Sequence, residues 1–153
     1  MVASISARKS VGAAVSYFKH MAEDEYYTGK GEAEAEADGE WDGRGAERLA
    51  LDGPVSKADF EATLNGIDPK TGERLTQISK SHAPGWDMTF SAPKSVSVMW
   101  ALSPPANRKT IEAALRQAVH AATTHLEDHH AFTRRGKGGA IREPVAGLTI
   151  ARF

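Results

Sequence analysis

Residues 85–97, with the sequence GWDMTFSAPKSVS, place a carboxylate, hydroxyl groups and a lysine within one short stretch. Apolar and polar residues alternate in its first half, which predicts a strand with one face on a core. Trp86, Met88 and Phe90 occupy the core face of this strand, and Asp87 lies on the opposite face. The strand therefore presents a carboxylate just before a predicted helix start.

That helix start is suited to bind an anion such as phosphate. Ser91 is a good cap, Pro93 fits the first turn because its missing N–H is unpaired there anyway, and residues 95–102 continue the helix. Free backbone amides and the positive end of the helix dipole attract an anion, and Lys94 adds a full charge. Lys94 and Ser95 are therefore candidate phosphate-binding residues, although a lysine at a helix start is more often only a surface charge.

Two groups near the C-terminal end are further candidates. His125 and His129 lie four residues apart with His130 adjacent, but helical histidine pairs without a third ligand are usually surface residues rather than metal ligands. A basic cluster could contact a DNA backbone, against the alternative of a solvated turn. Its members are Arg134, Arg135 and Lys137.

Near the N-terminus, residues 1–6 are predicted to form a strand, and Ser10 then caps a helix. The apolar stripe of this helix consists of Val11, Ala14, Val15, Phe18 and Met21. Tyr17 lies at the edge of the stripe, where a side chain can be held rigidly while its hydroxyl stays reachable. Residues 23–43 follow, with nine acids and one lysine between Glu23 and Asp42, and are predicted to form a flexible acidic loop.

The remaining pattern predicts a short helix over residues 57–64 with Phe60 and Leu64 facing inward, followed by a turn-rich connection to Gly72. A proline pair at 104–105 ends the helix of residues 95–102, and a longer helix is expected over residues 110–130. Residues 134–139 form a glycine-rich turn that leads to a strand ending at Phe153. This order indicates an α+β fold in which helices pack on an antiparallel sheet.

The amino-acid composition limits the number of domains and the class of protein that the chain can be. The chain has 153 residues, 41% of them hydrophobic, which is enough for one domain over residues 1–153. It has no cysteine, no signal peptide pattern and no apolar span, so we expect a cytoplasmic protein that does not enter a membrane. The net charge of −1 counts mildly against nucleic-acid binding, but a single strand needs only a basic groove.

Several separated motifs resemble one family. The stretch WDMTFSAPKSVSVMWAL of residues 86–102 resembles the signature of conjugative relaxases of the MobF or TrwC type, a family of HUH endonucleases. The resemblance extends to AVSYF at residues 14–18 and EDEYYTG at residues 23–29. Further family-like motifs follow in order at residues 41–46, 51–55 and 68–75, so the resemblance covers nearly the whole chain.

The resemblance implies a palm-like relaxase fold, incomplete at its C-terminal end, and a nickase that cuts one strand at a plasmid transfer origin. In the family a tyrosine attacks the scissile phosphate and stays joined to the 5′ end, which places that role on Tyr17. Tyr26 and Tyr27 match a second tyrosine pair used in later strand transfer, with Tyr26 the better candidate. Asp87 matches the aspartate that orients a ligand histidine and accepts the tyrosine proton. Phe18 stands where relatives often have another tyrosine.

The family also carries a histidine triad that holds Mg²⁺ or Mn²⁺, with all three histidines beyond a strand like residues 147–153. This sequence stops at Phe153, so we expect no metal at an HUH site and reduced or absent activity. An end inside an apolar strand favours a truncated domain. The exposed strand of residues 147–153 could then pair with a second copy to form a dimer.

The partners implied are single-stranded or hairpin transfer-origin DNA, a type IV secretion coupling protein and a C-terminal helicase domain. The alternative function is a relaxase remnant that binds single-stranded DNA without chemistry. Substitution of Tyr17 by Phe separates the two, because binding would survive and a covalent adduct would vanish.

Overall fold

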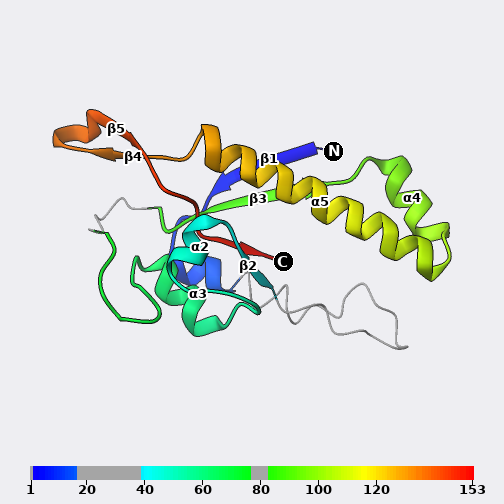
Figure 1. Cartoon of the computed structure of the whole chain (residues 1–153), viewed down its shortest axis with the longest axis horizontal. Helices are drawn as coiled ribbons and strands as arrows, with labels where there is room; N and C mark the ends of the chain where they lie inside the picture. The colour runs from blue at the N-terminus through cyan, green and yellow to red at the C-terminus, as the bar shows by residue number, and fades with distance from the viewer. Residues whose placement is uncertain (1, 17–38, 77–82) are drawn as a thin grey trace. The chain divides into compact units, whose positions relative to one another are not determined.

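The computed structural model describes residues 2–16, 39–76 and 83–153 (Figure 1). The chain divides into two compact units. One unit comprises Met1–Ser6 and Asp87–Val145, and the other comprises Ala7–Trp86 and Ala146–Phe153. We call the first the helical-hairpin unit and the second the α2–α3 unit, after its helices α2 (Arg44–Arg48) and α3 (Lys57–Leu64), and each is described by itself. Tyr17, Tyr26, Tyr27, His82 and most of the predicted acidic loop lie outside the described residues.

The helical-hairpin unit begins with two paired strands. β1 (Val2–Ala7) pairs with β3 (Trp86–Ser91), so both strands predicted from alternation are present. The predicted core face of β3 is only partly correct. Met88 and Phe90 are half-buried, but Trp86, the first residue of β3 and the last before the boundary between the two units, is 68% exposed.

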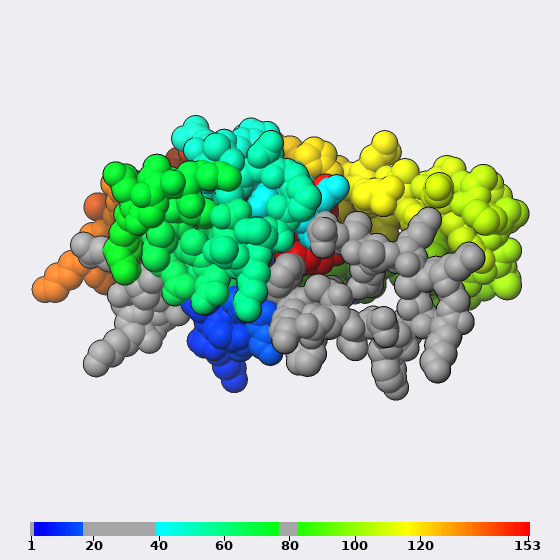
Figure 2. All heavy atoms as spheres, turned by 90° about the horizontal axis from the view of Figure 1, so that it is seen from below, coloured from blue at the N-terminus to red at the C-terminus, as the bar shows by residue number. Residues whose placement is uncertain are grey.

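Two helices follow as a hairpin, α4 (Lys94–Leu102) and α5 (Pro105–His129). The indole Nε1 of Trp100 donates a hydrogen bond of 2.7 Å to Oε1 of Glu112, which links the two helices. The Arg108 guanidinium donates to the carbonyl oxygens of Ala101 and Ser103 and lies 5.3 Å from the centre of the Trp100 ring. Figure 2 shows α4 and the first turns of α5 as one continuous block of atoms.

Two predicted helix boundaries are wrong in this unit. Ser91 is the last residue of β3 and does not cap α4; the cap position is Pro93, which makes no side-chain capping bond. α5 begins at Pro105, five residues before the predicted start at Thr110. The proline pair does end α4, but its second member occupies the first turn of α5, where a missing N–H costs nothing.

The unit ends in a β-hairpin made of β4 (Phe132–Arg135), a short 3₁₀ turn (Lys137–Gly139) and β5 (Ile141–Pro144). The strands are antiparallel, with Arg134 opposite Arg142 and Arg135 opposite Ile141. Gly136, Gly138 and Gly139 all have positive φ, which explains why the turn is rich in glycine. The predicted turn of residues 134–139 is confirmed only in part: its glycine-rich end is a turn, but Arg134 and Arg135 belong to β4, and the turn leads to β5 rather than to the last strand.

The α2–α3 unit contains β2 (Glu40–Asp42), α2 (Arg44–Arg48), α3 (Lys57–Leu64) and β6 (Ile150–Arg152), together with helical residues 11–16. Its most buried apolar side chains come from four separate segments. They are Ala14, Ala46, Leu51 and Val55.

β2 corrects the predicted extent of the acidic loop. Residues 40–42 were expected to belong to that loop, yet they form a strand that pairs antiparallel with β6. Arg152 explains why two acids are tolerated there: its guanidinium donates to Glu40 at 3.0 Å and to Asp42 at 3.1 Å. The predicted final strand is also shorter than expected, and its three strand residues are half-buried and paired with β2.

α3 has the predicted bounds. Ser56 caps it by accepting a hydrogen bond of 3.0 Å from the Asp59 amide, and the inward-facing Phe60 makes an edge-to-face contact of 5.9 Å with the Phe153 ring. The fold is therefore α+β, with helices beside short antiparallel pairs as the sequence indicates. In the described part of the chain, no helix combines the length and apolar character needed to cross a membrane.

Candidate functional site

The β3–α4 corner carries three of the predicted site residues. Asp87 is a half-buried residue of β3, and Lys94 and Ser95 are the exposed first two residues of α4. The earliest helix bonds are donated by the Val96 and Ser97 amides to the Pro93 carbonyl, at 2.9 and 3.1 Å. The amides of Lys94 and Ser95 precede these bonds, so the helix start offers donors together with one cationic side chain.

The helix that leads to Tyr17 begins as predicted. Ser10 accepts a hydrogen bond of 3.2 Å from the Ala13 amide through its hydroxyl, and its carbonyl accepts from the Ala14 amide at 3.1 Å. Ala14 is buried, and Val11 and Val15 are half-buried, so the apolar stripe of residues 11–16 is confirmed. Tyr17 itself, Tyr26 and Tyr27 lie outside the described residues, and their roles remain predictions.

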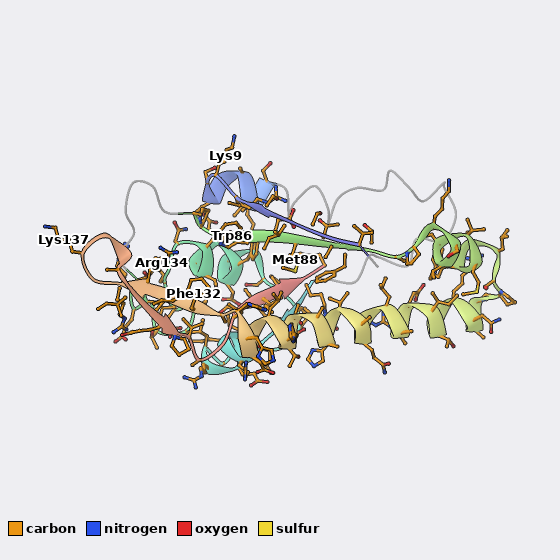
Figure 3. All side chains as sticks on the ribbon, turned by 90° about the horizontal axis from the view of Figure 1, so that it is seen from above. Lys9, Trp86, Met88, Phe132, Arg134 and Lys137 are labelled. Atoms are coloured by element: carbon orange, nitrogen blue, oxygen red, sulfur yellow. The ribbon has the colours of Figure 1, made fainter. Side chains whose placement is uncertain are left out.

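The basic cluster of the sequence lies on the β4–β5 hairpin, but its members differ in surroundings. Phe132, Arg134 and Lys137 follow one another toward the tip of the hairpin (Figure 3). Arg135 is paired, because its Nε lies 3.2 Å from a carboxylate oxygen of Glu143.

Arg142 is a basic residue that the sequence reasoning missed. Its guanidinium carbon lies 3.3 Å from the centre of the Phe132 ring, in a cation–π contact. The two residues are ten positions apart, and only the register of the hairpin brings them together. Residues 141–144, with the sequence IREP, do not alternate between apolar and polar side chains, so no local strand pattern pointed to β5 or to this contact.

The histidines near the end of α5 lie close together without forming a metal site. The ring centres of His125 and His129 are 4.5 Å apart, and His130 lies 5.6 Å from His125. Across residues 2–16, 39–76 and 83–153, no group of three or more His, Cys, Asp or Glu side chains could hold a metal ion. The described residues therefore do not fit the metal that the resemblance implies.

The loop after α3 is built around Asp68. One oxygen of its carboxylate accepts hydrogen bonds from the Lys70 amide at 2.8 Å and the Thr71 amide at 3.2 Å. The bond from Lys70, followed by smaller contributions from Thr71 and the Lys70 charge, lowers the pKa of the Asp68 carboxyl despite an opposing desolvation effect. Within the resembling motif of residues 68–75, Asp68 thus has a structural role as the centre of a turn.

A family model described as TrwC relaxase matches residues 11–153, which is nearly the whole chain. The chain belongs to the TrwC relaxase family. The resemblance seen in the separated sequence motifs is therefore confirmed.

A curated relative is the multifunctional conjugation protein TraI of Escherichia coli (strain K12), 37% identical over 130 residues. That match covers 80% of this chain and 7% of TraI.

Solved structures of TrwC are also similar. A metal-bound complex of the conjugative relaxase TrwC with oriT DNA matches with a TM-score of 0.69 and 30% identity, covering 98% of this chain and 49% of the solved chain. A second similar structure is TrwC complexed with a 27-mer DNA that comprises the recognition hairpin and the cleavage site. It matches with a TM-score of 0.67 and 27% identity, over 98% of this chain and 48% of the solved chain. The chain thus spans about half the length of these TrwC chains and a small part of TraI.

Proposed function

We propose that this chain is the N-terminal portion of a relaxase domain that nicks one DNA strand at a plasmid transfer origin. The observation that carries the proposal is the match to oriT-bound TrwC over 98% of the chain at 30% identity. In this proposal residues 1–153 belong to a single domain, and the chain acts on single-stranded or hairpin DNA.

The proposed chemistry is a transesterification by Tyr17. Its phenolic oxygen attacks the scissile phosphorus, a new phosphorus–oxygen bond joins the protein to the 5′ end, and the 3′ oxygen leaves with its electron pair. No water is consumed, so the phosphodiester energy is kept for later rejoining. A free phenol has a pKa of about 10, so the proton of Tyr17 must pass to a base. Asp87 is the proposed acceptor, and Tyr26, with Tyr27 beside it, is proposed for the second strand transfer.

The start of α4 is proposed to bind a phosphate of the DNA. Lys94 and Ser95 are exposed, and their amides precede the first helix bonds. No side chain caps this end of the helix, so a phosphate oxygen does not have to displace a capping group there.

TrwC has been solved with oriT DNA in metal-bound, copper-bound and metal-free structures. The described residues of this chain do not supply the ligands for such a site. We therefore assign to this chain the tyrosine, the aspartate and the DNA contacts, and derive no step through a metal ion.

Two of the partners proposed beyond DNA follow from the family: a type IV secretion coupling protein and a helicase domain in the same polypeptide. The third, a second copy paired through β6, is proposed because the edge of a strand can pair with another strand. In the described structure one edge of β6 already pairs with β2, so a second copy would use its other edge. A cytoplasmic location is part of the same proposal.

The second candidate function is DNA binding without chemistry. It is favoured by the lack of a metal-holding group among the described residues, because phosphoryl transfer depends largely on charge stabilisation. Binding of a labelled transfer-origin strand, measured by fluorescence anisotropy against a scrambled strand, tests what the two functions share. We expect a preference for the origin strand that Tyr17→Phe retains. Equal affinity for both strands would contradict recognition of a transfer origin, and no binding to either strand would contradict both functions.

A further inference from the structure

The two faces of the β4–β5 hairpin differ in charge. Side chains alternate between the faces, so the cross-strand register assigns each residue to one of them. Phe132, Arg134, Arg142 and Pro144 share one face, and Thr133, Arg135, Ile141 and Glu143 share the other. We call the first the arginine face and the second the paired face.

On the paired face the charge is compensated. The Nε of Arg135 lies 3.2 Å from Oε2 of Glu143, diagonally across the two strands. The pair is exposed, so it adds little to stability, but it leaves this face with no net charge from its strand residues.

On the arginine face the charge is not compensated by an acid. Arg134 and Arg142 are directly opposite each other, and like charges in that position destabilise a strand pair. Within the part of the chain that the structure describes, neither arginine makes an ion pair. A bound anion would relieve the repulsion between them.

Both arginines are also held in place by packing. The guanidinium carbon of Arg142 lies over the Phe132 ring, 3.3 Å from its centre. The stem of Arg134 lies against Gly139, where an added Cβ would come 3.3 Å from Cβ of Arg134 and 3.4 Å from its Cδ. Positioned guanidinium groups lose less conformational freedom on binding, and their planar fork suits phosphate.

We propose that the arginine face binds the phosphodiester backbone of DNA through Arg134 and Arg142, while the paired face does not. This inference rests on the proposed function and adds to it which surface of the hairpin meets DNA, with Arg142 as a contact and Arg135 excluded. A two-stranded ribbon is narrow enough to enter the major groove of a duplex, and the same phosphate chemistry occurs on a single strand. Lys137 lies at the tip of the hairpin (Figure 3), where its positive charge adds to the electrostatic potential near both faces.

The test uses the full chain and three variants of equal charge change, Arg134→Gln, Arg142→Gln and Arg135→Gln. The probes are a fluorescein-labelled blunt DNA hairpin and a poly-dT strand with the same number of nucleotides, each titrated at several salt concentrations. Circular dichroism confirms that each variant is folded. Arg142→Lys is a further variant that keeps the charge but loses the planar contact with Phe132.

We expect Arg134→Gln and Arg142→Gln each to weaken binding about tenfold, since a charge-assisted bond is lost. Affinity decreases with salt, and the steepness of log affinity against log salt concentration should decrease in each variant by about 0.9 for the DNA hairpin or about 0.7 for poly-dT. The probe for which the steepness changes identifies the form of DNA that the arginine face binds. Arg135→Gln should change affinity by less than about threefold, and Arg142→Lys should lie between wild type and Arg142→Gln.

Equal losses in all three glutamine variants would overturn the assignment to one face and indicate only general attraction. Unchanged binding in Arg134→Gln and Arg142→Gln, with wild type still preferring the transfer-origin strand, would overturn the inference and leave the proposed function standing. Failure of the wild-type chain to bind any probe would instead contradict the proposed function itself.

Discussion

Arg152 balances the charges of the β2–β6 pair. Its two guanidinium nitrogens reach Glu40 and Asp42 separately, and its side chain is 27% exposed. Asp42 also accepts a hydrogen bond of 2.9 Å from the Gly43 amide, which fixes the carboxylate at the start of α2. One arginine thereby connects a C-terminal strand to a strand more than 100 residues earlier.

We predict that Arg152→Ala lowers the free energy of unfolding by about 1–2 kcal/mol, since it removes two charge-assisted bonds and leaves two carboxylates near each other. Arg152→Lys keeps the positive charge but lacks the planar guanidinium that reaches both acids. The free energy of unfolding should therefore fall in this variant too, but by less than in Arg152→Ala. Urea unfolding followed by circular dichroism measures both. An alanine variant as stable as wild type would show that the ion pairs are not needed for this strand pair.

At the scale of elements, glycines fix how closely segments approach. An added Cβ at Gly45 would come 2.5 Å from the carbonyl carbon of Leu148 and 2.7 Å from the Thr149 amide nitrogen. The Gly45 amide also donates a hydrogen bond of 2.9 Å to the Leu148 carbonyl. The segment before β6 therefore lies directly against the first turn of α2.

Gly45→Ala should accordingly destabilise the chain by about 1–3 kcal/mol, because backbone rather than a flexible side chain would have to move. Gly12→Ala is the matched control: nothing lies within 4 Å of its added Cβ, and Gly12 lies in helical residues. The free energy of unfolding of Gly12→Ala should instead rise by about 0.5–1 kcal/mol. Thermal unfolding compares the two, and a shift in the same direction for both would contradict the close contact at Gly45.

The turn centred on Asp68 predicts a dependence of stability on pH. Its folded pKa is lowered from the ordinary value of 3.8, chiefly by the Lys70 amide, so the ionised form favours the folded state. The stabilisation is complete above the unfolded value and is lost as the pH falls through the lowered folded pKa. Asp68→Asn keeps an acceptor oxygen but does not titrate, so its stability should fall less than that of wild type between about pH 5 and about pH 2. The free energy of unfolding of wild type and of Asp68→Asn would be measured against pH. If the two curves stayed parallel, the titration of Asp68 would not contribute to stability.

Local signals predicted most elements, but they misplaced the cap of α4 and the start of α5, and they missed a strand that depends on a distant partner. The Ser56 cap and the apolar pattern gave α3 its bounds, and the alternation of residues 86–91 gave β3. β2 was missed because it is short and acidic, and its partner strand and neutralising Arg152 lie far along the chain. The contact between Arg142 and Phe132 was also missed, because it depends on the register of the β4–β5 hairpin rather than on the residue types alone.

At the scale of the whole molecule, the proposed DNA binding depends on where the charges lie rather than on the net charge. The chain has a net charge of −1, yet the arginine face and the start of α4 each offer positive charge without a paired acid in the described structure. The sequence motifs predicted the family, and the family model confirms it, whereas the roles of the candidate site residues stay predictions. The positions of the tyrosines lie outside the described residues, so the catalytic role of Tyr17 is tested by chemistry rather than by geometry.

The most direct test is whether Tyr17 becomes joined to DNA. A chimera in which residues 1–153 replace the matched half of the TrwC relaxase chain would be incubated with a labelled transfer-origin strand and Mn²⁺, then resolved on a denaturing gel. We predict a DNA-linked protein band that Tyr17→Phe abolishes while DNA binding is retained. An undiminished band in Tyr17→Phe, or no band from a chimera that binds the strand with Tyr17 intact, would contradict the account.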